Sequence, residues 1–102
     1  MTHPSKVKGN TFEREIVNEA KLWGIEAKRA YGSNGLALGR TEDVDILLNG
    51  FEIQCKRRKK LPDIVRPDRS DIIQVVREDH GESFAILPIK LFYVLIAQNN
   101  KG

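Results

Sequence analysis

Cysteine and long apolar runs are nearly absent from this sequence, and each absence narrows the class of protein. Cys55 is the only cysteine, so the chain has neither an internal disulfide framework nor a cysteine-based zinc site. Its apolar runs, of which residues 91–97 are typical, are far shorter than the roughly 20 residues that span a bilayer. The N-terminal residues also lack the apolar core of a signal peptide. We therefore expect a cytoplasmic protein without a membrane partner.

What remains is the composition of an ordinary globular chain, with 40% hydrophobic and 30% charged residues in a length of 102. That length suits a single domain over residues 1–102, with flexible ends at 1–9 and 98–102. The net charge is only +3, yet residues 56–60 form an unbroken basic run. Such a run is either a solvated surface segment or a contact for a polyanion, and the surrounding motifs must decide between the two.

A helix and a strand are predicted for the N-terminal third. Asn10 is typical of a helix N-cap, and Glu13 is placed to form the reciprocal capping bond. Apolar residues recur at helical spacing, at Phe12, Ile16, Ala20 and Trp23. Gly24 is a natural terminator, so the helix should cover about residues 11–23. Residues 25–31 are predicted to form a strand, followed by a polar, glycine-rich loop.

The segment from 44 to 57 predicts a β-hairpin, because Asn49-Gly50 separates two apolar-rich runs and suits a type I′ turn. A two-residue turn fixes the register, which pairs Leu48 with Phe51, Leu47 with Glu52, Ile46 with Ile53, and Asp45 with Gln54. Alternation then gives one apolar face, made of Val44, Ile46, Leu48, Phe51, Ile53 and Cys55. The other face carries Glu52, Asp45, Gln54 and Lys56.

The C-terminal part is predicted to add a helix and two strands. The helix starts at Ser70 or Asp71 and is stopped by Gly81, although the β-branched run at 72–76 leaves a strand open as an alternative. Strands are expected at Phe84–Leu87 and at Leu91–Ala97. The predicted fold is therefore α/β, with a central mixed, largely antiparallel sheet flanked by helices.

The polar face of the hairpin suits phosphodiester hydrolysis. This reaction uses a divalent ion to polarise the phosphate and activate water, together with positive charge near the scissile group. Magnesium prefers oxygen ligands and is usually held by one or two carboxylates. Asp45 facing the amide oxygen of Gln54, with Lys56 one step along, meets this requirement. Lys56 would orient or deprotonate the attacking water, or stabilise charge in the transition state.

The order of Asp45 and then residues 54–56 (Gln-Cys-Lys) resembles the motif of the PD-(D/E)xK nuclease superfamily. That motif is an acid followed, on the next strand, by (D/E)-x-K. The resemblance implies a restriction-endonuclease-like nuclease core.

Within that superfamily, the likeness is to archaeal and phage-type Holliday junction resolvases. Residues 8–15, KGNTFERE, resemble their opening K-G-x-x-x-E-R-E helix. Arg29 with Gly32-Ser33 matches their R-x-x-G-S step. The resemblance covers about residues 8–58 and continues in a plausible order of elements to about residue 97.

Carried over by position, this resemblance implies a Mg²⁺- or Mn²⁺-dependent site. Glu13 would be the helix-borne acid that reaches the metal or its waters, and Ser33 would match the active-site serine. Asp45 would be the central metal ligand and Lys56 the catalytic lysine. The backbone carbonyl of Cys55 would hold the ion as well.

The sequence departs from the family pattern in two places. Gln54 stands where an acid is usual; its amide oxygen can still ligate a metal but brings no negative charge. Glu52 lies on the same face and offers a carboxylate, one step farther from Lys56. The loop from Ser33 to Asp45 is also long, which puts the place of Ser33 in question.

The implied partner is DNA, in particular four-way junctions, whose near two-fold symmetry suits a C2 homodimer. Leu91–Ala97 is a candidate interface, as an apolar strand at a sheet edge. The basic residues expected to contact phosphates are Lys8, Arg14, Arg29, Arg57, Arg58, Lys59, Lys60, Arg66 and Arg69.

Other interpretations of these residues stay open from sequence alone. One alternative assigns Glu13 only to the helix cap, and another makes the polar trio an ordinary strand surface. The alternative functions are a different nuclease of the superfamily (flap, end-processing or mobile-element type), a DNA-binding module without catalysis, and a scaffold without a nucleic-acid role.

Overall fold

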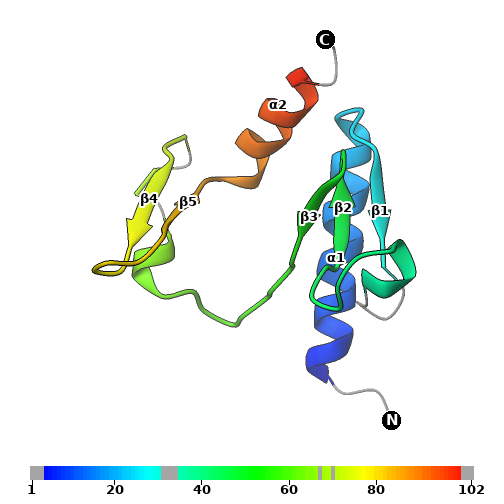
Figure 1. Ribbon diagram of the computed structural model, residues 1–102, viewed down its shortest axis with the longest axis horizontal. Coiled ribbons are helices and arrows are strands. Elements are labelled where there is room, and N and C mark those ends of the chain that lie inside the picture. The colour runs from blue at the N-terminus through cyan, green and yellow to red at the C-terminus, as the bar shows by residue number, and fades with distance from the viewer. Residues whose placement is uncertain (1–3, 31–34, 67, 70, 100–102) are drawn as a thin grey trace.

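The structure, a computed structural model, describes residues 4–30, 35–66, 68–69 and 71–99 (Figure 1). In chain order the elements are α1 (Pro4–Leu22), β1 (Ala27–Arg29), the 3-10 turn η2 (Gly35–Leu38), β2 (Ile46–Leu48), β3 (Phe51–Ile53), the 3-10 turn η3 (Asp63–Val65), β4 (Gln74–Arg77), β5 (Ser83–Ile86) and α2 (Ile89–Asn99). The predicted mixed α/β class is confirmed. Instead of one central mixed sheet, however, the described strands form two small antiparallel sheets. Neither described helix is long and apolar enough to cross a membrane.

Helix α1 begins well before the predicted start. Residues 4–9, expected to be flexible, belong to the helix, so Asn10 lies inside it and is not its N-cap. The predicted capping role of Glu13 is wrong for the same reason. The polar N-terminal residues extend a helix that is stabilised by packing farther along, where Ile16, Val17 and Ala20 are buried.

The end of α1 is as predicted. Gly24 has a φ of 76°, in the left-handed region that favours glycine. Its N–H donates to the carbonyl of Lys21 at 3.0 Å, and the N–H of Ile25 donates to the carbonyl of Ala20 at 3.1 Å. This pair of bonds is a Schellman motif, and it turns the chain so that Ile25 enters the core.

The hairpin register in the first sheet, whose strand order is β1-β2-β3, is confirmed at three pairs of residues: Leu48–Phe51, Leu47–Glu52 and Ile46–Ile53. Asn49 and Gly50 both have positive φ, 50° and 85°, as a type I′ turn requires. Strand β1 adds antiparallel to the other side of β2. All three residues of β2 are therefore buried, including Leu47 on the face that also carries Glu52.

The core lies between this sheet, α1 and α2, as seen on the right of Figure 1. Two members of the predicted apolar face do not join its main cluster: Val44, which is buried elsewhere, and Phe51, which is 50% exposed. Its ring packs edge-on against Phe92 of α2, with the centroids 6.3 Å apart. Because Phe51 lies next to the turn and at the sheet edge, only one neighbouring helix reaches it.

The predicted strand at Leu91–Ala97 is wrong, because these residues lie in helix α2. The carbonyl of Pro88 accepts the N–H groups of Leu91 and Phe92 and starts the helix. Tyr93 and Ile96, one helical turn apart, are both buried in the core. The proposed dimer contact through a strand edge at this place is therefore wrong as well, and the expected flexible end begins inside the helix.

The docking of α2 depends on two polar side chains. Asn49 accepts the N–H of Glu26 on its Oδ1 at 2.8 Å and donates from Nδ2 to the carbonyl of Ile96 at 3.4 Å. The hydroxyl of Tyr93 donates to Glu19 of α1 at 3.0 Å. Burial and this hydrogen bond raise the pKa of Tyr93 well above its usual value.

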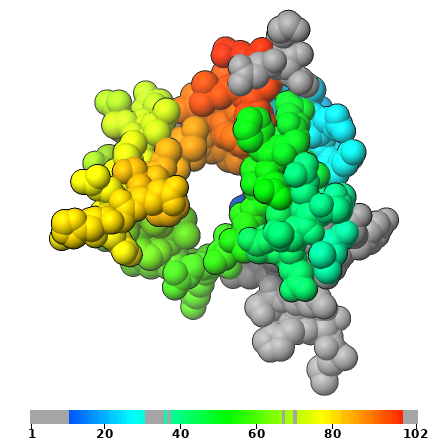
Figure 2. Space-filling view, in the orientation of Figure 1, coloured from blue at the N-terminus to red at the C-terminus, as the bar shows by residue number. Residues whose placement is uncertain are grey.

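The predicted helix after residue 70 is also wrong, and the strand left open as the alternative is correct. Strand β4 overlaps the run at 72–76 and pairs with β5, which confirms the predicted strand near Phe84. Figure 2 shows that this hairpin stands away from the core and that an opening separates the two parts. The radius of gyration is accordingly 14.8 Å, against about 13 Å for a compact chain of this length.

Candidate active site

Glu13 projects from the buried side of α1. It lies one turn before Ile16 and Val17, which belong to the core, and is only 3% exposed. The structure thus places the Glu13 carboxylate within the buried face of the helix.

Asp45 lies immediately before β2 and is 9% exposed. Its N–H donates to the carbonyl of Ile53 at 3.0 Å, although Ile53 already pairs with Ile46 in the ladder. Two residues thus face one, as at a β-bulge, and the predicted pairing of Asp45 with Gln54 is wrong. The bulge turns the carboxylate toward the chain that leaves β3, where its Oδ2 accepts the N–H of Cys55 at 2.7 Å.

The Cys55 thiol is affected by both buried carboxylates. Burial raises its pKa from 9.0 to about 12, and the negative charges of Asp45 and then Glu13 contribute to the rise. The carboxylate of the helix and that of the hairpin therefore both act electrostatically on this thiol, and Asp45 also accepts a hydrogen bond from the Cys55 N–H.

This electrostatic effect predicts the reactivity of the thiol. Because its pKa is raised, Cys55 should be alkylated only at higher pH in the folded, metal-free protein than in the protein unfolded in denaturant. Asp45→Asn should lower the pH at which alkylation begins, and Glu13→Gln should do so to a smaller extent. Iodoacetamide reaction rates measured against pH by intact mass test this.

Asp43→Asn is the matched control, since Asp43 is exposed and is not among the causes of the Cys55 shift. An equal effect of this control, or none from Asp45→Asn, would show that the two buried carboxylates do not act on Cys55.

Gln54 and Lys56 are exposed and flank Cys55 in the extended segment after β3. Together with Cys55 and Ile53 they line a cavity of about 470 Å³. Its other walls come from α1 and from the junction of β5 with α2, namely Phe12, Ile16, Ile86, Leu87 and Ile89. Residues 86–89 could not be assigned to this place from sequence, because only the return of the chain into α2 puts them there.

The predicted basic residues divide into three groups. Arg14 and the run 57–60 are exposed. Arg29 is half-buried on β1, and its Nε is buried without a hydrogen-bond partner among the residues described. Arg66 and Arg69 belong to the part across the opening, where they pair with Asp63 at 2.6 Å and with Asp71 at 3.1 Å. Ser33 and the side chain of Lys8 are not among the parts of the chain that the structure describes.

The donor set suits a hard divalent cation bound in part by water and substrate. In the described part of the chain, no three carboxylate, imidazole or thiol groups are arranged to hold a metal by themselves. Magnesium commonly uses only one or two carboxylates, and Asp45 with Glu13 supplies that number. Asp45 forms no ion pair with a described basic side chain. Its buried carboxylate therefore favours the binding of a metal cation.

Comparison with known proteins adds no relative: no family model, no curated protein and no solved structure matches this chain.

Proposed function

We propose that this protein is a Mg²⁺- or Mn²⁺-dependent, structure-selective DNA endonuclease that hydrolyses phosphodiester bonds in four-way junctions. The observation that carries the proposal is that Glu13 and Asp45 are both buried, that Asp45 is hydrogen-bonded to the N–H of Cys55, and that the exposed Lys56 follows directly. This combination gives oxygen ligands for a cation and a positive charge at one site, which phosphodiester hydrolysis requires. The resemblance of the motifs to Holliday junction resolvases supports the same activity.

Each side chain has a distinct role in the proposed reaction. The bound cation would polarise the scissile phosphate and lower the pKa of its water. Asp45, held rigid by the N–H of Cys55, and Glu13 would fix the cation in place. Lys56 would orient the attacking water or stabilise negative charge on the phosphate in the transition state.

The substrate would be held by its phosphates rather than by its bases. The run 56–60 and Arg14 present exposed positive charge, which attracts the backbone of DNA without reading its sequence. A C2 homodimer would present two such sites to opposed strands of a junction.

Gln54→Glu probes the departure from the family pattern. Gln54 is exposed at the edge of the cavity, so the substitution should be tolerated by the fold. If the amide oxygen ligates the cation, the added negative charge should lower the Mg²⁺ concentration needed for half-maximal cleavage by about tenfold. Glu52→Gln is the control for the neighbouring carboxylate. A loss of cleavage in Gln54→Glu at saturating Mg²⁺ would show that a neutral side chain is required there.

The decisive experiment is a nicking assay with Mg²⁺, Mn²⁺ or EDTA on four-way junction, flap and linear duplex substrates of shared sequence. We expect metal-dependent cleavage of the junction, faster than that of the duplex. Preferential cleavage of flaps would assign the chain to another nuclease type. Salt-dependent junction binding without any nick would refute catalysis and identify a DNA-binding module.

A further inference from the structure

The part of the molecule across the opening, made of η3, β4 and β5 and here called the arm, has no core of its own. All described residues of β4 and β5 are exposed or half-buried. Three large apolar side chains of the arm are strongly exposed, namely Ile64 (66%), Val75 (68%) and Phe84 (60%). Phe84 shares one face of the hairpin with Val76, whereas Val75 lies on the other. A two-stranded hairpin with exposed apolar faces is at best marginally stable in water.

The arm is not positioned to cover this face by folding back on its own chain. It is anchored at one end by β3 in the first sheet and at the other by Tyr93 and Ile96 in the core. Figure 2 shows the opening between the arm and this body, so the body leaves the arm uncovered.

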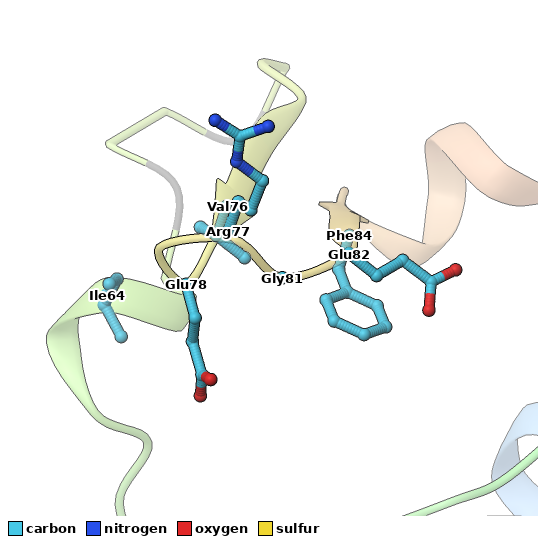
Figure 3. A pocket seen from close by; sticks show the side chains of 7 residues that line it. All are labelled: Ile64, Val76, Arg77, Glu78, Gly81, Glu82 and Phe84. Atoms are coloured by element: carbon cyan, nitrogen blue, oxygen red, sulfur yellow. The ribbon is translucent and has the colours of Figure 1, made fainter.

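The exposed face contains a hollow with a mixed chemical character. Its volume is about 320 Å³, with an apolar floor of Ile64, Val76 and Phe84. The rim carries the carboxylates of Glu78 and Glu82, on either side of the Phe84 ring in Figure 3. The other two residues that line it are Arg77 and Gly81, and the Arg77 guanidinium points away from these carboxylates. An occupant should therefore be apolar with positive charge beside it.

The same chain displays such a segment. Lys59, Lys60 and Leu61 are consecutive and exposed, with Leu61 43% exposed, and none of the three lines its own hollow. Neither these lysines nor Glu78 and Glu82 form an ion pair with any other described residue. Only Pro62 and Asp63 separate Leu61 from Ile64, so the segment and the hollow lie close together on one surface.

We propose that two copies of this chain associate through reciprocal insertion of Lys59-Lys60-Leu61 of each copy into the acidic-rimmed hollow of the other. Leu61 covers the apolar floor, and the lysines lie against Glu78 and Glu82. The basic segment and the acidic-rimmed hollow lie close together on one copy. A two-fold axis therefore brings each segment to the hollow of the other copy, and both contacts form at once. This contact would form the interface of the homodimer in the proposed function, on which it rests. It assigns Lys59 and Lys60 of the basic run to the interface, so that Lys56, Arg57 and Arg58 are the members of the run that contact DNA.

A charge-swap experiment tests this contact, using the full chain without DNA or metal. Sedimentation should show a wild-type dimer in the micromolar range. Glu78→Lys/Glu82→Lys and Lys59→Glu/Lys60→Glu should each weaken the dimer by about 100-fold or more, because like charges then face each other. An equimolar mixture of the two variants should regain a dimer, since opposite charges meet at both contacts.

The apolar part of the contact is tested separately by Phe84→Ala, which should weaken the dimer. The control is Leu22→Ala, since Leu22 is 87% exposed and lies outside the arm, and this variant should not weaken the dimer. Circular dichroism confirms that each variant is folded. A wild-type monomer, a dimer insensitive to both charge reversals, or a mixture that stays monomeric would overturn the proposal. Capture of a different basic peptide by a monomer would do so too. Because no nuclease activity is measured, these results stand apart from the proposed reaction.

Discussion

Asp45→Asn is expected to lower the rate of junction cleavage by about 100-fold or more, since a metal ligand supplies several kcal/mol to the transition state. The amide keeps an oxygen that can accept the N–H of Cys55 and removes only the negative charge. The fold and the affinity for DNA should therefore change little. Single-turnover rates at saturating protein, with junction binding measured separately, give the two quantities.

The matched control is Asp43→Asn, an exposed carboxylate two positions earlier that we expect to have little effect on cleavage. Full activity of Asp45→Asn would remove Asp45 from the site. A similar loss in both variants would mean that the general negative charge of this loop, rather than a ligand at Asp45, affects the rate.

Lys56→Met should produce the second large loss, of about 100- to 10,000-fold in the cleavage step, as expected for a group that moves or orients a proton. Lys56 is exposed, so its replacement by an unbranched apolar side chain leaves the core unchanged. The substitution also removes one of several phosphate contacts, so junction binding should weaken much less than cleavage. The number of counterions released on binding, measured from the salt dependence, should fall by about one. The rate constant and the dissociation constant thus separate catalysis from binding.

Lys28→Met is the control for Lys56, because Lys28 is an exposed lysine of β1 in the same sheet. It should cleave junctions at close to the wild-type rate. If Lys56→Met loses activity only in proportion to its weaker binding, Lys56 belongs to the phosphate contacts and not to the reacting centre.

The sequence predictions that the structure confirms depend on the backbone preferences of single residues and their neighbours in the chain. The Asn49-Gly50 turn sets the hairpin register, because positive φ at both positions admits few other conformations. Gly24 ends α1 for a similar reason, through the left-handed conformation of the Schellman motif. These features depend on residues that are neighbours in sequence.

The errors arose where distant contacts decide the outcome. Residues 91–97 are apolar throughout, and such a run forms a helix or a strand according to what it packs against. Here Tyr93 and Ile96 pack against α1 and the β2–β3 hairpin, and this packing selects the helix. Likewise, the start of α1 at Pro4 could not be found from Asn10, since a favourable capping residue does not prevent a helix from continuing.

The candidate site combines both kinds of information. The sequence by itself selected Glu13, Asp45 and Lys56, because acids and a lysine in this order suit metal-assisted hydrolysis and resemble a nuclease motif. Only the tertiary structure buries Glu13 on the helix, and the bulge before β2 turns Asp45 toward Cys55 instead of Gln54. The physical reason is that residue type fixes which chemistry is available, whereas packing between α1 and the hairpin fixes which groups meet.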